Sequence, residues 1–260
     1  MHNNSMSRTK SPTGYAAPAL SKGLRLLETL AASPLPLGLA ELGRAIGKSS
    51  AEIFRMVAVL EQEGYVRRDP QGAYLATLKL FTLGRSVDPL RALLSAAAGP
   101  MRDFARLTGQ ECHLSVLEEG QLVVIAQESG TAAVTIRVRE GSRHNPLATA
   151  SGRLLLALLP QVEAGRQVML ARALFKGPTV TDIELRRAWK QIARARCSTA
   201  RNESLAGLAD TAVPVRGTGA WTHAALASSH FLAAKDSSRL AHALNELRAA
   251  ATAIAKNTAG

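Results

Sequence analysis

Leu39–Tyr74 reads LAELGRAIGKSSAEIFRMVAVLEQEGYVRRDPQGAY, and this stretch decides the fold of the N-terminal part of the chain. It contains two short helical patterns, a tight junction and a basic hairpin. A junction this short presses one helix across the other and leaves the outer face of the second helix exposed. An exposed helix that begins with small, polar and basic residues fits the major groove of duplex DNA. The stretch therefore predicts a winged helix-turn-helix that binds DNA.

The second helical pattern carries its own start and stop signals. Ser49 can cap the N–H groups of the first turn, and Glu52 three residues later completes a capping box. Gly64 follows the last apolar position, where the end of a helix favours a left-handed residue. One stripe recurs at three- and four-residue steps and is expected to face a core: Ile53, Met56, Val57 and Leu60.

The opposite face of this helix and the hairpin after it form the expected DNA-binding surface. The hairpin turns at residues 69–72, and Arg67 and Arg68 lie where phosphates run past a wing. The helix face offers Lys48, Ser50, Ala51, Phe54 and Arg55. A preceding helix, capped at Ser21, completes a three-helix unit through Leu24, Leu27 and Leu30. The alternative is an ordinary helical hairpin with solvated charges, but the combination of features favours DNA binding.

Residues 43–49, GRAIGKS, look like a phosphate-binding loop, which requires the pattern G-x-x-x-x-G-K-[ST]. The spacing is one residue short, and Leu42 stands where the first glycine belongs. Such a loop also follows a buried strand, whereas Leu39, Leu42 and Ile46 repeat with a helical period. Nucleotide hydrolysis is therefore not expected.

Composition supports this interpretation only in part. A chain of 260 residues with 47% hydrophobic residues is long enough for two compact domains. The net charge of +12 favours a polyanionic partner, but the excess is not confined to the N-terminal part. Residues 1–85 carry eleven basic and six acidic side chains, and twenty-one and fourteen follow. The placement of individual cations therefore matters more than bulk charge. The 4% of aromatic residues argues against a single-strand binder built on stacking.

Cysteine usage and the terminal segment indicate a cytoplasmic protein. Cys112 and Cys197 give neither a disulfide framework nor a zinc spacing, and suit a reducing compartment as small buried groups. Residues 1–18 are polar and lack an apolar core for export, so we expect a disordered leader. The longest apolar run, Leu154–Leu159, is too short to span a bilayer. No membrane partner is expected.

The chain is expected to continue with a linker helix and a second domain. A helical stripe begins at Asp88, is interrupted at Gly99-Pro100 because proline breaks or kinks a helix, and resumes at Met101. The expected segments are a leader at 1–18, a winged helix-turn-helix at 19–83, a linker helix at 84–100 and a second domain at 101–260.

The second domain shows strand and helix patterns in alternation. Strands are expected at His113–Leu117 and Leu122–Gln127 around a tight turn, and at Val134–Val138, Ala209–Val215 and Trp221–Ser228. Helices are expected at Ala150–Leu159, capped by Thr149, at Ile183–Ala195, capped by Asp182, and at Ser237–Ile254. This order describes a mixed α+β, sensor-like domain whose sheet is flanked by helices. The basic face of the helix at 183–195 is expected to be solvated, with an oligomer or DNA contact as the alternative.

Patterns of hydrolytic chemistry are missing from the sequence. It contains no G-x-S-x-G, no H-E-x-x-H and no pair of carboxylates placed for acid–base work. Cys112 and His113 are neighbours in a strand, so their side chains point to opposite faces and form no shared site. The remaining histidines are expected on the surface or in loops: His144, His223, His230 and His242. We therefore expect no catalytic residue, no metal and no cofactor.

The chain resembles the IclR family of bacterial transcription regulators from about Ala19 to Lys256. The resemblance lies in SKGLRLLETL (Ser21–Leu30), the stretch Leu39–Val66, PLATASGRLLLALLP (Pro146–Pro160) and NESLAGLADTAVPV (Asn202–Val215). It implies an N-terminal winged helix-turn-helix and a C-terminal effector-binding domain related to the GAF fold. It also implies binding to palindromic operators in double-stranded DNA as a dimer or tetramer, and a response to small organic molecules, often carboxylic acids or aromatics.

The resemblance assigns roles to the second helix. Lys48, Ser49, Ser50, Phe54 and Arg55 fall on the family pattern K-S-T-x-[YH]-R. Ser50 and Phe54 would face base edges, whereas Lys48, Ser49 and Arg55 would hold phosphates.

The resemblance also places an effector pocket over the start of the helix at Ala150-Ser151-Gly152, where unpaired N–H groups and the helix dipole suit a carboxylate. Ser151 matches that place, Asp210 aligns with a position often held by cysteine, and Ser229 aligns with a serine near the end of the last strand. The chain departs from the family at residues 225–231, ALASSHF, where a serine-rich strand ending in S-G-P is usual. Asp210 would repel an anionic effector unless paired or protonated. The alternative is that Ser151 is structural and Asp210 solvated.

Three functions follow for the chain. The first is a transcription regulator controlled by a small-molecule effector, an organic or aromatic acid. The second is a metabolic enzyme with an accessory DNA-binding domain, against which the missing catalytic patterns argue. The third is a constitutive DNA binder without an effector, which a ligand screen by thermal shift would separate from the first.

Overall fold

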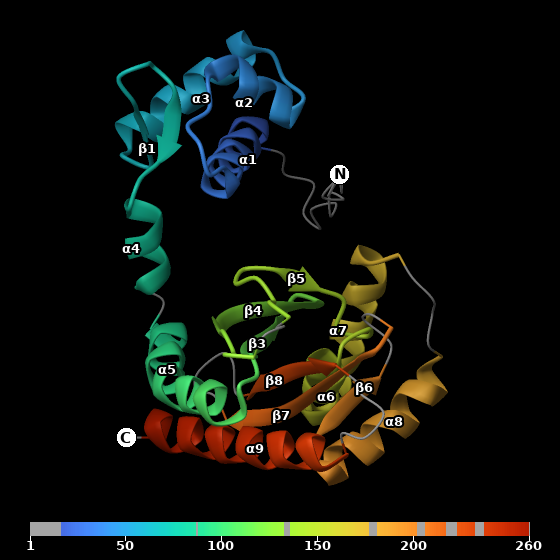
Figure 1. Cartoon of the computed structure of the whole chain (residues 1–260). Coiled ribbons are helices and arrows are strands. Elements are labelled where there is room, and N and C mark those ends of the chain that lie inside the picture. Colours follow the sequence, from blue (N-terminus) through green and yellow to red (C-terminus); the bar gives the residue numbers. More distant parts are fainter. Residues whose placement is uncertain are drawn as a thin grey trace. The chain divides into compact units, whose positions relative to one another are not determined.

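The computed structural model describes residues 17–86, 88–132, 136–176, 181–201, 206–216, 223–231 and 237–259. It divides into two compact units, residues 1–88 and residues 89–260, and each has its own core (Figure 1). The predicted leader lies outside the described residues except at its end. The predicted boundaries at 83 and 100 stay predictions.

The N-terminal unit is a winged helix-turn-helix. The predicted fold of this part is confirmed by three helices followed by a two-stranded antiparallel hairpin and a short fourth helix. The elements are α1 (Pro18–Ala32), α2 (Leu39–Ile46), α3 (Ser50–Gln62), β1 (Val66–Arg68), β2 (Tyr74–Ala76) and α4 (Lys79–Arg85). One core joins all three helices to the hairpin.

The first helix begins earlier than the sequence suggested. Pro18 is its first residue and Ala17 provides no side-chain cap, so the predicted cap at Ser21 is wrong. Proline is favoured at this position because its fixed φ is already helical and it has no N–H to satisfy. The buried stripe consists of Gly23, Leu26 and Leu30, whereas Leu24 is 52% exposed.

The predicted signals of the second helix are confirmed in α3. Ser49 Oγ accepts a hydrogen bond from Glu52 N at 3.3 Å, and Ser49 N donates to Glu52 Oε2 at 3.1 Å. Ile53 and Val57 are fully buried, and Met56 and Leu60 pack against the same core. Gly64 adopts the expected left-handed conformation, with φ of 72°. One face of α3 is thereby fixed and the other stays outside.

A close approach of two backbones forms the junction between α2 and α3. Gly47 ends α2 with φ of 69°. A Cβ atom on Gly43 would lie 2.6 Å from the carbonyl oxygen of Lys48, so only glycine fits there without a shift of the junction. Residues 39–46 form a helix, and the nucleotide-binding loop is excluded as the sequence analysis expected.

The C-terminal unit is built on an antiparallel sheet of six strands in the order β5-β4-β3-β8-β7-β6. The strands are β3 (Cys112–Glu118), β4 (Gln121–Glu128), β5 (Arg143–His144), β6 (Ser198–Arg201), β7 (Leu208–Arg216) and β8 (His223–Phe231). The predicted hairpin turns at Glu119 and Gly120, both with positive φ. The predicted mixed α+β architecture is confirmed.

Helices cover both faces of this sheet. One face packs against α5 (Asp88–Thr108) and α9 (Ser237–Ala259) in the largest core (Figure 1). The other face packs against α6 (Ala150–Leu158) through alanines of β6, β7 and β8. Beyond α6 lie α7 (Gln161–Leu174) and α8 (Asp182–Ala195), which form a smaller cluster with it.

Some predicted elements of this unit are wrong. The helix α5 continues through Pro100, because Leu93, Ala97, Met101 and Phe104 pack on one sheet face on both sides of it. Residues 136–139 form no strand; residues 134 and 135 lie outside the described residues. Thr181, not Asp182, caps α8 by accepting from Glu184 N. No sequence pattern predicted α7, β5 or β6.

No helix among the described residues combines the length and apolarity that a membrane span requires.

Candidate DNA-binding surface and small-molecule site

The predicted recognition residues lie on the outer face of α3. Phe54 is 51% exposed, and Ala51 and Arg55 are exposed beside it, whereas Ser50 is half-buried. An exposed large aromatic side chain on a capped helix has no role in the core of this unit, since Ile53 and Val57 fill the buried side. This face combines an apolar contact, a hydroxyl and a cation, the three groups that read base edges and hold phosphates.

Glu52 contacts three side chains at the start of α3. Its Oε1 lies 3.5 Å from Lys22 Nζ and 3.7 Å from Lys48 Nζ, and its Oε2 receives the Ser49 hydroxyl at 3.2 Å. The backbone hydrogen bond from Ser49 is the main cause that lowers the pKa of Glu52. These ion pairs are exposed and contribute little to the stability of the fold. A phosphate can therefore replace Glu52 as the partner of Lys48. Ser49 is already engaged as the cap of α3. The phosphate contacts predicted for Lys48, Ser49 and Arg55 stay predictions.

The two predicted arginines of the wing differ in their surroundings. Arg68 Nε donates to Glu61 Oε2 at 3.2 Å, and its guanidinium lies 4.8 Å from the centre of the Tyr74 ring. Arg67 is exposed, and among the described residues it forms no hydrogen bond or ion pair. Arg67 is therefore the cation of the wing that is free to meet a phosphate, and Arg68 fastens the wing to α3.

In the C-terminal unit, two of the predicted effector residues meet directly. Asp210 on β7 pairs with Ser229 on β8, and Ser229 Oγ donates to Asp210 Oδ1 at 2.6 Å. Both lie on the sheet face that α6 covers, because Ala212 and Ala227, next on the same face, pack against Ala150. The start of α6 and the Asp210–Ser229 pair thus lie on the same side of the sheet.

Ala150 and Ser151 are nearly inaccessible, at 1% and 2% exposure. The turn before α6 lies directly on the helix: a Cβ atom on Gly152 would be 2.3 Å from Pro146 Cα. Thr149 Oγ1 accepts from Gly152 N at 3.1 Å, as predicted for the cap. The other N–H groups of the first turn have no partner within the helix itself. Whether these residues bind an effector stays a prediction.

The sequence did not reveal a buried polar row formed by β3 and the residue before it, Glu111. Glu111, His113 and Ser115 alternate on the face that α6 covers, at 1%, 8% and 0% exposure. Glu111 Oε1 accepts from Ser229 N at 3.1 Å and lies 3.5 Å from His113 Nδ1. Among the described residues, Glu111 Oε2, His113 Nδ1 and Ser115 Oγ have no hydrogen-bond partner. The alternation of polar residues in a strand was the signal, but the sequence did not show that this face is buried.

Two histidines also depart from expectation. His144, expected in a loop, lies in β5, and its Nε2 is 2.9 Å from Ser142 Oγ. Burial, and then the nearby His113, lower the pKa of His144. His230 is 8% exposed, so the prediction of a surface position is wrong; burial is the main cause that lowers its pKa. A strand between two neighbours buries its side chains on both faces, which a short polar sequence does not reveal.

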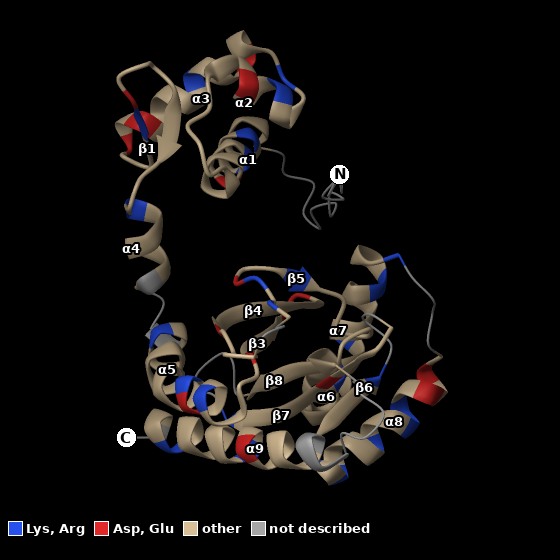
Figure 2. Ribbon diagram, viewed as in Figure 1, with Lys and Arg blue, Asp and Glu red and all other residues tan. Residues whose placement is uncertain are grey.

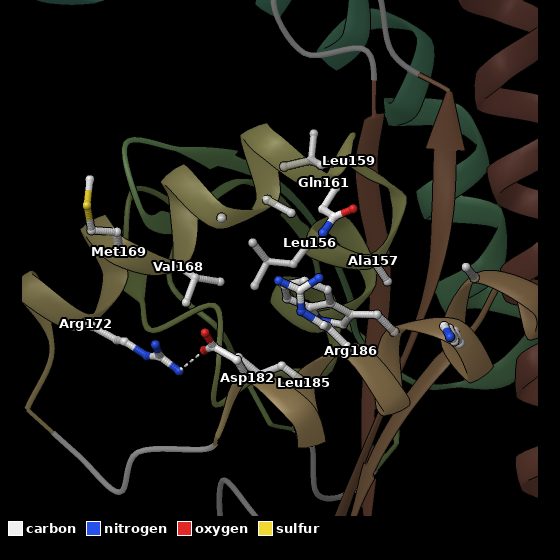
Figure 3. A pocket seen from close by; sticks show the side chains of 15 residues that line it. Leu156, Ala157, Leu159, Gln161, Val168, Met169, Arg172, Asp182, Leu185 and Arg186 are labelled. Carbon is white, nitrogen blue, oxygen red and sulfur yellow. Dashed lines mark hydrogen bonds and ion pairs between the residues drawn. The ribbon is translucent and has the colours of Figure 1, made fainter.

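A cavity open to solvent lies away from these groups. It lies between α6, α7 and α8, and none of the four predicted effector residues lines it (Figure 3). No group of three or more metal-binding side chains gathers anywhere in the described part of the chain. Cys112 is buried, and burial raises the pKa of its thiol; Cys197 is half-buried with a pKa also raised by burial.

Comparisons with known proteins match both units. The family model described as IclR helix-turn-helix domain matches residues 19–70, and the model described as Bacterial transcriptional regulator IclR C-terminal matches residues 90–256. The HTH-type transcriptional regulator XynR of Escherichia coli is 26% identical over 246 residues, which cover 92% of this chain and 96% of XynR. The regulator KdgR of Dickeya chrysanthemi is 32% identical over 149 residues, 56% of this chain and 48% of KdgR.

Solved structures agree with the fold. An IclR homologue from Microbacterium hydrocarbonoxydans, solved in complex with 4-hydroxybenzoate, has a TM-score of 0.77 at 25% identity and covers 92% of this chain and 98% of its own. The IclR protein of Thermotoga maritima has a TM-score of 0.69 at 21% identity, with 91% and 97% covered, and shows the fold alone.

Proposed function

Because the chain belongs to the IclR family of bacterial transcriptional regulators, we propose that it binds a palindromic operator through α3 and its wing, under the control of a small organic effector. Its relatives are regulators and not enzymes. Two copies would place two α3 helices about 34 Å apart on one face of the duplex, as helix-turn-helix dimers do. Such a regulator acts in the cytoplasm.

The exposed face of α3 carries this proposal. Phe54 and Arg55 are exposed on this face and Ser50 is half-buried beside them. We assign Phe54 and Ser50 to base edges and Arg55 to a phosphate, in keeping with the chemistry of each side chain. The wing adds Arg67, which forms no ion pair with the described residues. The resulting surface separates residues that specify a sequence from residues that supply affinity.

Substitutions at Arg55 and Ser50 are expected to act differently on DNA. Arg55→Ala removes a phosphate contact, so the Kd should rise about tenfold on every duplex and the salt dependence should weaken. Ser50→Ala should change the ranking of operator variants, because a base-edge contact contributes about 1–3 kcal/mol of discrimination. Gel shifts on a duplex selected from a random library, and on its single-base variants, measure both.

Arg25→Ala is the matched control. Arg25 is exposed on α1, so this substitution removes the same charge from another surface of the unit. Its affinity should stay within about twofold, as expected for a distant surface charge. If Arg55→Ala re-ranked the variants while Ser50→Ala weakened all of them equally, the assigned roles would be reversed.

The effector is proposed to be an organic acid that also carries hydroxyl groups. A carboxylate alone would meet the buried carboxylate of Glu111, which repels it. A hydroxyl group instead donates a hydrogen bond to Glu111 Oε2, while the acid group binds at the start of α6 and at His113. The relative solved with 4-hydroxybenzoate holds a molecule with both groups. Because Ser151 and its neighbours are buried, such a ligand has to displace the turn at Pro146.

A thermal-shift screen of hydroxylated acids, starting with 4-hydroxybenzoate, tests the effector proposal. At a hundred times its Kd a true effector stabilises the fold by about 2.7 kcal/mol, and it should also alter operator affinity. Glu111→Gln should weaken the response about tenfold, since it replaces a charged acceptor with a neutral amide.

Glu118→Gln at the far end of β3 is the control, because Glu118 is exposed beyond the polar row. An equal thermal shift of Glu111→Gln and Glu118→Gln with the effector would show that Glu111 does not contact it. The absence of any stabilising ligand, together with firm operator binding, would leave a constitutive regulator.

A further inference from the structure

We propose that the cavity between α6, α7 and α8 is a second ligand site, which takes an organic anion with an apolar or aromatic body. Its volume is about 750 Å³, within the range of small-molecule sites in proteins. The cavity lies at the far end of α6 from the proposed effector residues, around Leu156 and Leu159 and not around Ser151. The two sites therefore share a helix but no side chain.

The floor of the cavity is apolar. Leu156 of α6, Val168 of α7 and Leu185 of α8 meet in one buried cluster, and Trp189 packs against it. Figure 3 shows Leu156 and Val168 on one side of the space and Leu185 on the other. Such a floor favours a hydrocarbon or aromatic ring, since each buried CH₂ group stabilises binding by removing apolar surface from water.

Cations dominate the rim. Arg172 of α7 donates to Asp182 of α8 at 2.8 Å, so the one carboxylate of the lining is already paired. Arg186 and Lys190 stand one turn apart on α8 and form no ion pair among the described residues. Figure 2 shows Lys and Arg along this helix. Two adjacent cations above an apolar floor are complementary to an anionic head group on an apolar body.

The indole of Trp189 gives a separate indication of a ligand. Its Nε1 is buried, and no acceptor for it exists among the described residues. Indole N–H is only a donor, and a buried donor without an acceptor is costly. A carboxylate or sulfonate oxygen in the cavity would supply the acceptor. A neutral apolar ligand would leave this donor unpaired and the two cations unused.

Binding of 8-anilinonaphthalene-1-sulfonate, an aromatic anion, tests the site, with the uncharged N-phenyl-1-naphthylamine as its analogue. One molecule of the anion should bind per chain and quench Trp189 in a Trp221→Phe background, where Trp189 is the remaining tryptophan. The double variant Arg186→Ala with Lys190→Ala should weaken binding of the anion about tenfold and change the analogue less than twofold. Arg187→Ala, which removes a charge from the same helix outside the lining, is the matched control.

A second pair of variants tests the location. Gly165 lines the cavity, and a Cβ atom there meets nothing within 4 Å, so the backbone leaves room for a side chain to begin. Gly165→Phe should occupy part of the cavity and lower affinity at least tenfold. Gly165→Ala should bind as the parent does, and thermal melting checks that both variants fold. Glu111→Gln should leave this binding unchanged, which separates the cavity from the effector site.

Three outcomes would overturn the proposal. Binding of the probe by Gly165→Phe with parental affinity would show that the probe does not occupy the cavity. Equal loss of the anion and its uncharged analogue in the Arg186–Lys190 variant would show that charge is not recognised. A change of oligomeric state in Gly165→Phe, seen by sedimentation, would show that the cavity is an interface between copies of the chain.

Discussion

Gly43→Ala is expected to abolish specific operator binding. The new Cβ atom would lie 2.6 Å from the backbone oxygen of Lys48, and a backbone atom cannot move without shifting the start of α3. Overpacking of this kind costs about 1–3 kcal/mol or more, a large part of the stability of so small a unit. Because Ser50, Phe54 and Arg55 then no longer align with the wing, affinity should fall at least about a hundredfold, towards that of non-specific binding.

Gly23→Ala is the control for this substitution. Gly23 is also buried in a helix of the same unit, but a Cβ atom there meets nothing within 4 Å. Alanine should therefore stabilise α1 by up to about 1 kcal/mol through its higher helix propensity and leave DNA binding intact. Thermal melting and anisotropy of a labelled duplex measure both effects. Operator binding by Gly43→Ala at parental affinity would show that the junction tolerates a side chain.

Gly152→Ala is expected to have a comparable effect on the C-terminal unit. Its Cβ atom would lie 2.3 Å from Pro146 Cα and 2.4 Å from Pro146 O. The turn at Pro146 and the start of α6 must then separate, which opens the buried polar row beneath them. We expect a loss of about 1–3 kcal/mol or more in stability and a loss of the thermal response to any effector that binds there.

The control is Gly165→Ala on α7, which adds the same methyl group in open space. Its melting temperature should be equal to or above that of the parent. Denaturant unfolding monitored by circular dichroism gives the two free energies. A Gly152→Ala protein as stable as the Gly165→Ala protein would mean that the turn at Pro146 moves at little cost, and would favour easy entry of a ligand.

The local signals of the DNA-binding unit were sufficient to predict its fold. The capping box at Ser49, the left-handed Gly64 and the turn before Tyr74 each act within a few residues, so each can be recognised in the sequence. The exposed face of α3 followed directly from its apolar stripe. The α1 cap was wrong, because Pro18 starts a helix as effectively as a serine, and with it the place of Leu24, which is exposed. The short helix α4 was not predicted.

The C-terminal unit was less predictable because its strands are buried by partners distant in sequence. The segment at 136–139 alternates like a strand but pairs with nothing as a strand, whereas the two residues of β5 pair with β4. Alternation of polar and apolar residues shows only that a segment favours the strand conformation. Pairing also requires an unpaired edge of the sheet next to that segment. Pro100 likewise stays within α5, since packing on both sides of it outweighs the lost hydrogen bond.

The candidate sites show the same division. The sequence by itself determined the two-unit organisation, the recognition helix with Phe54 and Arg55, and the start of α6, because short-range patterns encode them. Only the tertiary structure brought Glu111 to Ser229 and Ser229 to Asp210, and placed Arg186 and Lys190 over an apolar cavity. The physical reason is that the periodicity of a strand or helix is present in its own residues. The residues that it packs against can lie more than a hundred positions away in the chain, and only folding brings them together.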